Sequence, residues 1–364
     1  MQAKSFAQLV VCVCIVALVV ADSLGESLAS SSPPGDPARV DPIILQAEDT
    51  YLPVSLKSSE SSDCGVIQSA IDALPPTGGQ ILLSSGTFTC TTAIVIERDQ
   101  VDLRGQGAST ILSLANAANS PVIVVGQVVT PPSVTHRHIR IADLSIQGNR
   151  ERQTQECWGG PCDTGGLTFI RNNGITLRRV SDVQIEHVSV EGAMSGGLVT
   201  EKGSQRITVQ DFSSANNQFD GLAAYETEDS VFSGLYLHDN LFAGLSLDIH
   251  FNHNIISQAV IVNNGRQGVF MRDSRDNVFS AIQIRGSGEQ GVFLAQVDAD
   301  ATKPAAGNTF SGLNVSGSGQ AGLRVNNASC INNLVIGAQF SANQACISEA
   351  IPGLVQQVGV VCRE

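Results

Sequence analysis

"GLAAYETEDSVFSGLYLHDNLFAGLSL", residues 221–247, holds one full period of a repeat that continues on both sides. Short apolar segments begin at glycines that are 23 or 24 residues apart, with a single interval of 31. These glycines are Gly174, Gly197, Gly221, Gly244, Gly268, Gly291 and Gly322. A second short strand, such as SVFSGLYL, lies between consecutive glycines, and no segment of helical pattern separates them. Repeats of this length built from short strands predict a solenoid.

The strand pattern predicts an all-β fold, a single right-handed parallel β-helix with rungs stacked ~4.8 Å apart. Successive side chains of a strand point to opposite faces, so the positions one and three after each glycine should point inward. Leu222 and Ala224 hold these positions in one repeat, and Leu245 and Leu247 hold them in the next. Within the long interval, the segment DADATKPAA at 298–306 is expected to be a loop inserted into one rung.

Asparagines recur at fixed turn positions of the repeat. One set is Asn217, Asn240 and Asn264, and a second comes from the NxFS segments at Asn277 and Asn308. Stacked asparagine side chains can satisfy the backbone groups of turns in successive rungs. We therefore expect these asparagines to have a structural role.

The position four after each glycine should point outward, and it is unusually rich in charged and phenolic groups. It reads Arg178, Glu201, Tyr225, Asp248, Arg272, Ala295 and Asn326. Arg179 and Lys202 follow at the next position, and His250, six after its glycine, is expected on the same outer side. The alternative interpretation is a solvated ladder of salt bridges, which would add little stability. We favour a binding or catalytic surface.

The N-terminal end predicts a secreted protein, extracellular or in the cell wall. Lys4, an apolar run over 9–20 and Ala21 resemble a signal peptide at 1–21, and the run is shorter than the ~20 residues that span a membrane. Residues 22–62 are rich in Ser and Pro and should form a linker or loosely held arm. The β-helix domain should cover 63–364, beginning with a capping helix whose apolar residues lie between Val66 and Leu74.

Seven cysteines follow the predicted leader, and an oxidising compartment should pair most of them. We expect bonds between Cys64 and Cys90, between Cys157 and Cys162, and between Cys330 and Cys346, with Cys362 left over. Sequons at Asn314 and Asn327 would allow N-glycosylation in a eukaryotic host.

The net charge of −13 and pI of about 4.8 argue against a nucleic-acid partner. They do not exclude an acidic polymer, because the charge within a groove matters more than the total. We expect a monomer that contacts neither membrane nor nucleic acid.

The chain resembles the pectate-lyase-like β-helix superfamily from about residue 60 to 350. GVIQSAIDALPPTGGQILLSSGTFTC at 65–90 and VDLRGQG at 101–107 look like its N-terminal capping helix and first rungs. LDIHFNHN at 247–254, followed by NNGRQGVFMR at 263–272, is similar to the Asp-Pro-His segment of alginate (mannuronan) carbon-5 epimerases. The resemblance implies Asp248 and His250 as catalytic residues, with Arg266 or Arg272 contacting the substrate carboxylate.

This chain departs from the epimerase motif at two positions. Ile249 stands where the family has Pro, and Leu245 stands where it has Tyr. We expect Tyr225, one rung earlier and in line with Asp248, to supply the phenol instead.

The implied substrate is an acidic polysaccharide, and the implied reaction starts with removal of the proton at carbon 5. His250 would act as base or acid, Tyr225 as its counterpart, and Asp248 would orient His250 or raise its pKa. Epimerisation or β-elimination would follow, and both His250→Ala and Tyr225→Phe should abolish turnover without unfolding the chain. The groups expected to contact the substrate or neutralise its carboxylate are Arg178, Arg179, Glu201, Lys202, Arg266 and Arg272.

Three other functions also fit the sequence. A calcium-dependent lyase could use Glu201 and Asp248 as Ca²⁺ ligands and Arg272 as base. An inverting glycoside hydrolase of pectin-like polymers could use the same two carboxylates, which should lie about 9.6 Å apart between backbones. A secreted glycan-binding or cell-wall protein would bind in the groove without turnover.

Overall fold

The computed structural model describes residues 54–58, 62–157, 162 and 170–363. The predicted signal peptide at 1–21 and the predicted arm up to residue 53 lie outside the described residues. No helix among the described residues is long and apolar enough to cross a membrane.

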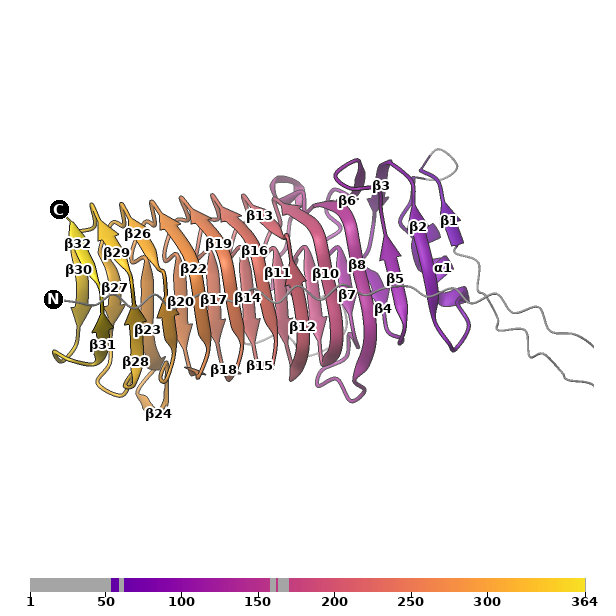
Figure 1. Cartoon of the computed structure of the whole chain (residues 1–364). Coiled ribbons are helices and arrows are strands. Elements are labelled where there is room, and N and C mark those ends of the chain that lie inside the picture. Colours follow the sequence, from indigo (N-terminus) through magenta and orange to yellow (C-terminus); the bar gives the residue numbers. More distant parts are fainter. Residues whose placement is uncertain (1–53, 59–61, 158–161, 163–169, 364) are drawn as a thin grey trace, which may run out of the picture. The chain divides into compact units, whose positions relative to one another are not determined.

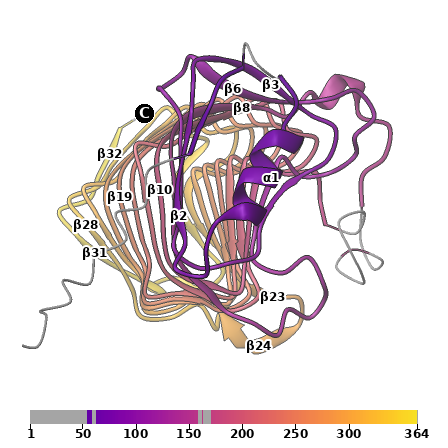
Figure 2. The same cartoon turned by 90° about the vertical axis from the view of Figure 1, so that its right-hand side faces the viewer.

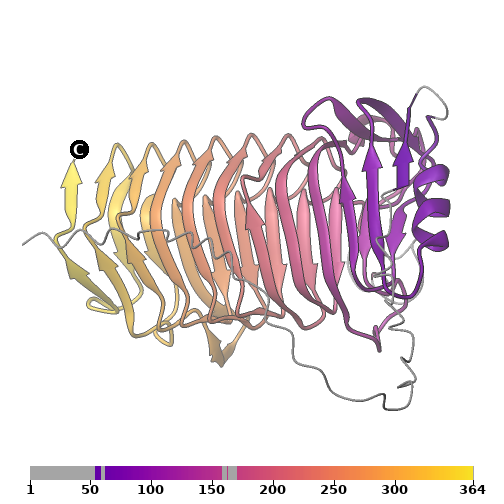
Figure 3. The same ribbon diagram turned by 45° about the vertical axis from the view of Figure 1, so that its right-hand side comes forward.

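Two parallel sheets coil together into a solenoid whose strands stack in sequence order (Figures 1 and 3). The expected parallel β-helix is confirmed. The larger sheet contains β1 (Val54–Leu56), β2 (Gly79–Leu83), β3 (Gly86–Cys90), β5 (Val101–Arg104), β6 (Thr110–Leu114), β8 (His136–Gln147), β10 (Val180–Glu191), β12 (Ser204–Gln210), β13 (Ser213–Ala215), β15 (Thr227–Glu228), β16 (Val231–His238), β18 (Phe251–Asn252), β19 (Ile255–Val262), β21 (Ser274–Arg275), β22 (Val278–Arg285), β25 (Thr309–Ser311), β26 (Asn314–Ser316), β28 (Asn333–Ile336), β29 (Gln339–Ser341), β31 (Val355–Val358) and β32 (Val361–Arg363).

The second sheet carries the repeat that begins at each glycine. It contains β4 (Ile94–Ile96), β7 (Ile123–Val125), β9 (Ile175–Arg178), β11 (Leu198–Glu201), β14 (Leu222–Tyr225), β17 (Leu245–Asp248), β20 (Val269–Arg272), β23 (Val292–Val297), β24 (Asp300–Pro304), β27 (Ala321–Val325) and β30 (Ala345–Glu349). A short 3-10 helix spans Arg150–Arg152.

Strand pairing follows the register that the glycine spacing predicts. Leu222 pairs with Leu245, and Leu245 pairs with Val269. The positions one and three after each glycine are buried in a continuous apolar core, with Leu222, Ala224 and Leu245 fully inaccessible. The burial of these positions directs the position four after each glycine to the outer face of the sheet.

The asparagine ladders lie at two corners of the coil. At one corner, the Asn240 Nδ2 donates to the Asn264 Oδ1 at 2.9 Å, and the Asn217 Nδ2 donates to the Asn240 Oδ1 at 2.7 Å. At the other corner, the Asn277 Nδ2 donates to the Asn308 Oδ1 at 2.9 Å. All five side chains are buried, which agrees with the structural role expected for them.

The N-terminal end of the solenoid carries a helix, α1 (Gly65–Ala73), which lies across the first rungs (Figure 2). Its apolar side buries Ile67 and Ile71 against the core. Regular structure begins earlier than residue 63, because β1 lies inside the segment predicted as an arm and pairs with β2. The alternation of Val54 and Leu56, both packed on the core, explains why this short stretch joins the sheet.

The inserted segment forms a hairpin rather than an irregular loop. β24 pairs antiparallel with β23 and projects from the coil (Figure 2). The Arg275 guanidinium donates to the Thr302 carbonyl oxygen and so fixes the hairpin to the neighbouring rung.

Two of the three expected disulfides are confirmed, Cys64–Cys90 and Cys157–Cys162. The third prediction is wrong: Cys346 bonds to Cys362, and Cys330 is a free buried thiol. The position of each cysteine in the coil explains the pairing. Cys346 in β30 and Cys362 in β32 both lie in the final rungs, whereas Cys330 lies at a turn and is buried in the core. Asn314 is exposed on β26, and the Asn327 Oδ1 accepts a hydrogen bond from the Gln296 backbone N–H. Glycosylation of either asparagine remains a prediction.

Candidate functional site

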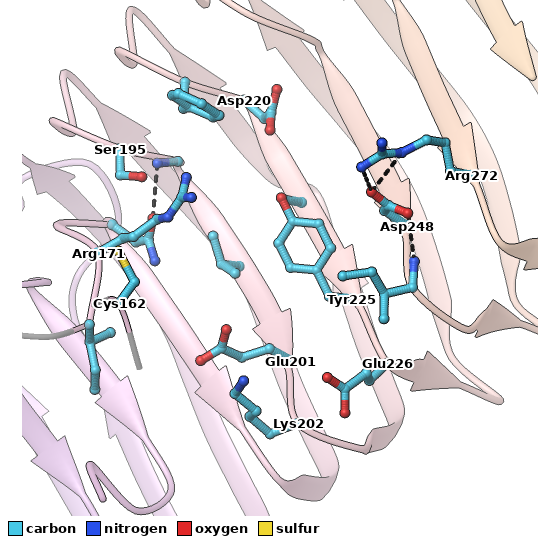
Figure 4. Close-up of a pocket in the computed structure, with 17 residues that line it drawn as sticks. Cys162, Arg171, Ser195, Glu201, Lys202, Asp220, Tyr225, Glu226, Asp248 and Arg272 are labelled. Atoms are coloured by element: carbon cyan, nitrogen blue, oxygen red, sulfur yellow. Dashed lines mark hydrogen bonds and ion pairs between the residues drawn. The ribbon is translucent and has the colours of Figure 1, made fainter. Parts of the chain in front are cut away.

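A cavity of about 370 Å³ lies on the outer face of the second sheet, over β11, β14 and β17 (Figure 4). Tyr225 stands at its centre, with Arg171 on one side and Asp248 on the other. Its other polar side chains include Asn173, Ser195, Glu201, Lys202, Asp220, Glu226 and Arg272. The floor is built of small and aliphatic residues, Val199 and Ala223, which leave room above the sheet.

The outward column that the repeat predicts is present in register. Glu201 pairs with Arg178, and Tyr225 pairs with Asp248. Three members, Glu201, Tyr225 and Asp248, line the cavity together with Arg272 of the following rung.

Arg178 does not reach the cavity, which corrects its assignment as a substrate contact. Its side chain is fully buried and donates to the Val128 carbonyl oxygen at 2.9 Å and to the Thr130 Oγ1 at 2.7 Å. The Nε atom lies 2.9 Å from the Glu201 Oε1. A segment some 50 residues upstream therefore covers Arg178, and the arginine holds Glu201 in place at the edge of the cavity.

Asp248 is also far less exposed than expected, at 3 %. Its Oδ2 accepts hydrogen bonds from the Arg272 Nε at 3.0 Å and the Nη2 at 2.5 Å, and its Oδ1 accepts one from the Ile249 N–H. Burial raises the pKa of Asp248, while Arg272 opposes that shift. Asp248 and Arg272 thus form a partly buried ion pair in one wall.

His250 does not line the cavity, and its expected pairing with Asp248 is wrong. Its Nδ1 lies 3.2 Å from the Asp273 Oδ2, and the imidazole is 58 % exposed. The cause is local backbone geometry: β17 ends at Asp248, and Ile249 and His250 both adopt positive φ, 52° and 60°. The two-residue alternation stops there, so six positions after the glycine is no longer the outer face of the strand.

The remaining predicted contacts divide between the cavity and its surroundings. Lys202 lines the cavity, and Arg179 is exposed outside it. Arg266 lies over the Phe242 ring at 4.2 Å and lines an adjoining cavity that also contains Asp220, Tyr225, Asp248 and Arg272.

Asp220 and Tyr225 are the most perturbed titratable pair of the cavity. Burial raises the pKa of Asp220 to about 7, against opposing effects from the Ala243 N–H, Arg171 and Ser246. Burial and the nearby charge of Asp220 also raise the pKa of Tyr225. Ser246 lies close enough to both side chains to oppose the rise of each pKa.

Reasoning from the sequence missed Arg171, Asp220 and Glu226. A signal for Asp220 was present, because the residue before the glycine in the other repeats is uncharged: Asn173, Gly196, Ala243, Gln267, Gln290 or Ala321. A carboxylate at that buried turn position is an exception to the repeat. Arg171 precedes the regular repeats, and no periodic signal could have found it.

Glu201 and Asp248 do not fit a Ca²⁺ site. Each carboxylate faces an arginine, at 2.9 Å and 2.5 Å, and the rung that carries Tyr225 lies between them. Ca²⁺ takes about 6–8 oxygen ligands from carboxylates, carbonyls and water. Over the described part of the chain, no three His, Cys, Asp or Glu side chains gather in a way that could hold a metal ion.

Comparison with known proteins supports the architecture. The family model described as a right handed beta helix region matches residues 165–302. No curated protein sequence matches the chain.

Similar solved structures span most of the chain. The A-module of mannuronan C-5 epimerase AlgE6 from Azotobacter vinelandii has a TM-score of 0.61 at 17 % identity, over 83 % of this chain and 95 % of that one. Endo-xylogalacturonan hydrolase from Aspergillus tubingensis has a TM-score of 0.61 at 10 % identity, over 85 % and 92 %. Pectate lyase Pel9A has a TM-score of 0.57 at 12 % identity, over 83 % and 78 %. At these identities the likeness concerns the fold: the chain is a right-handed parallel β-helix.

Proposed function

We propose that this protein acts on an acidic polysaccharide and removes the proton at carbon 5 of a uronate residue. One arrangement carries the proposal: Asp220 and Tyr225 line the same cavity, burial raises the pKa of Asp220 to about 7, and burial also raises the pKa of Tyr225. Titratable neighbours with separated pKa values are the usual arrangement for acid and base catalysis. Two proteins of similar fold are named as a mannuronan C-5 epimerase and a pectate lyase, and both names refer to acidic polysaccharides.

The first requirement of the chemistry is neutralisation of the uronate carboxylate. The hydrogen on carbon 5 becomes acidic enough to remove only when the developing enolate-like charge is stabilised. Arg171 and Lys202 line the cavity on the side opposite the Asp248–Arg272 pair (Figure 4). We assign these two cations to the carboxylate.

The second requirement is a base and an acid. Asp220, as carboxylate, takes the proton from carbon 5, and the electron pair of the broken bond moves toward the carboxylate of the sugar. Transfer of the Tyr225 hydroxyl proton to the opposite face of carbon 5 gives epimerisation. In β-elimination, the pair forms a double bond between carbons 4 and 5, the bond from carbon 4 to oxygen breaks, and Tyr225 protonates the leaving oxygen.

Glycoside hydrolysis is the second candidate, because Asp220 could also donate its proton to a glycosidic oxygen. A carboxyl group with a raised pKa beside an ionised one is the arrangement that glycosidases use. Asp248 is the second carboxyl group. Burial raises its pKa, and its ion pair with Arg272 opposes that shift in favour of the ionised form. The Glu201–Asp248 pair considered from the sequence is less suited, because both carboxylates are held by arginines.

Product analysis on polymannuronate, polyguluronate, polygalacturonate and a neutral glucan separates these functions. New ultraviolet absorbance from an unsaturated sugar identifies a lyase, and an unchanged chain length with altered proton NMR identifies an epimerase. Reducing ends without that absorbance identify a hydrolase. Binding without any product would identify a glycan-binding protein and contradict the proposal.

The pH dependence gives a second, independent discriminator. As a base, Asp220 must be ionised, so kcat/KM should rise with pH through about 7. As the acid of a hydrolase, Asp220 must be protonated, so kcat/KM should fall over the same range. Asp220→Asn should remove the titration in either case.

We also propose that the protein works outside the cell as a monomer. Its disulfides would persist in an oxidising compartment, where acidic polysaccharides of walls and matrices occur.

A further inference from the structure

A separate cavity of about 500 Å³ lies on the same outer face, nearer the C-terminal end, over β23, β27 and β30. Its centre is formed by Phe293, Arg324 and Ser348, which pair with one another on three successive rungs. Arg324 is four rungs from Tyr225, which corresponds to about 19 Å along the solenoid axis.

The lining of this cavity has a single charge. Among the described residues that line it, Arg324 is the one charged side chain, and the others are amides, small residues and Phe293. The Arg324 Nη1 donates to the Ser348 Oγ at 2.7 Å. Within the described residues, no carboxylate lies within ion-pair distance of Arg324, unlike Arg178 and Arg272. The guanidinium therefore keeps donors for a ligand, and that ligand should be an anion.

Three glutamines give the cavity neutral hydrogen-bonding groups: Gln290, Gln320 and Gln344. The Gln290 Nε2 donates to the Gln320 Oε1, so these two amides have fixed orientations. Amides and one arginine can recognise the hydroxyl groups and carboxylate of a uronate, while a protein surface would need more apolar area.

A row of aromatic rings connects the two cavities. The outward position two after the glycine is small at Ala223, in the first cavity, and at Ser246, in the adjoining cavity. It is aromatic further along, at Phe270 and Phe293. The rings of Phe270 and Phe293 stack at 5.6 Å with an angle of 10°. Both rings are partly exposed, so they offer a flat apolar surface on which the face of a sugar ring can pack.

We infer that this cavity is a distal subsite that binds the carboxylate of a uronate through Arg324 while the same chain occupies the catalytic cavity. The inference rests on the proposed function, because it takes the substrate to be an acidic polysaccharide. It adds a prediction about chain length: a chain must extend over four rungs before Arg324 contributes to binding.

The test compares KM for long polymannuronate, polyguluronate or polygalacturonate chains with KM for short oligomers that fill the first cavity alone. Arg324→Gln should raise KM for the long chain roughly tenfold, the effect of losing a charged hydrogen bond. It should leave kcat and the short-oligomer KM unchanged, and Arg324→Lys should restore part of the affinity. Arg285→Gln is the matched control, since Arg285 is exposed on β22 of the other sheet.

An unchanged KM for long chains in Arg324→Gln would overturn the subsite, as would equal weakening of long and short chains. If the wild-type protein turns over no polyuronate, the proposed function fails, and equilibrium binding of the same chains then tests the subsite. Weaker binding of long acidic chains by Arg324→Gln would support the subsite without catalysis. Equal binding by the wild type and the variant, or absence of binding, would overturn it.

Discussion

At the scale of single residues, the candidate site depends on a carboxyl group in a place that the repeat otherwise gives to uncharged residues. Asp220 is 5 % exposed, and its Oδ1 accepts the Ala243 N–H at 2.9 Å. Burial of a carboxylate costs free energy, and the group responds by keeping its proton to higher pH. That cost is the physical sign of a functional residue, because an alanine or glutamine at this position would cost less.

Asp220→Asn should change the pH dependence of stability. Burial raises the pKa of Asp220 from 3.8 to about 7, so the folded state keeps a proton that the unfolded chain loses. Its contribution to stability is complete below the ordinary pKa and is lost as pH rises toward 7, at a cost of roughly 4 kcal/mol. Urea unfolding at several pH values should show a smaller decline in Asp220→Asn than in the wild type, because burial also raises the pKa of Glu156 to about 7 and its contribution remains. Equal slopes in both proteins would contradict the assignment.

Tyr225→Phe and His250→Ala should now behave differently. Removing the Tyr225 hydroxyl removes the proposed acid and should lower kcat by at least about 100-fold, while the ring still packs. His250 faces Asp273 outside the cavity, so His250→Ala should keep most of the wild-type kcat. Steady-state kinetics on the active polyuronate measures both. Loss of activity in His250→Ala would show that His250 takes part in catalysis, as the sequence predicts.

At the scale of elements, the sequence predicts the rungs well because inward positions repeat with the strand alternation. Leu222, Leu245 and Val269 lie in register where the glycine spacing places them. The alternation holds only within a strand, and β9, β11, β14, β17 and β20 each end four residues after their glycine. At the next position Arg179, Lys202, Glu226, Ile249 and Asp273 all have positive φ. Side chains beyond that point, His250 among them, could not be placed by counting.

The sequence also could not predict which outward side chains a distant segment of the chain would bury. Arg178 is outward from the core, yet Val128 and Thr130 cover it through contacts separated by about 50 residues in the chain. No repeat relates these segments, so the sequence pattern carries no information about which outward residues remain accessible. Arg171 also lies in the site without any signal from the repeat, because it precedes the regular repeats, whereas the carboxylate at Asp220 is an exception that the repeat shows.

Asn240→Ala should destabilise the solenoid. The Asn240 Oδ1 accepts hydrogen bonds from the Asn217 backbone and side chain, and its Nδ2 donates to Ser214 O and Asn264 Oδ1. Alanine would leave several buried groups without partners, at a cost of about 1–3 kcal/mol. Urea unfolding measures the loss against Asn314→Ala, an exposed asparagine of β26. Equal stability of the two variants would show that the ladder contributes little.

At the scale of the whole solenoid, each rung contacts its neighbours and little else, so stability should vary along the coil. The first rungs are covered by α1 and tied by Cys64–Cys90, and the last are tied by Cys346–Cys362. The pairing of Cys362 illustrates a limit of sequence reasoning, since three late cysteines allow several pairs. Only the register of β30 and β32 selects between them.

Removing the last disulfide should loosen the C-terminal rungs while the catalytic cavity stays intact. The Cys346–Cys362 bond closes a loop of 16 residues, so Cys346→Ser with Cys362→Ser should lower the free energy of unfolding by about 3 kcal/mol. Limited proteolysis should release the C-terminal segment first. Gln344 and Ser348 line the distal cavity, so KM should rise for long chains and stay unchanged for short oligomers. Cys330→Ala, which removes a buried thiol and no disulfide, is the control. Loss of activity on short oligomers would mean that the last rung and the catalytic cavity unfold as one unit, because disorder at one end would then have spread across the intervening rungs.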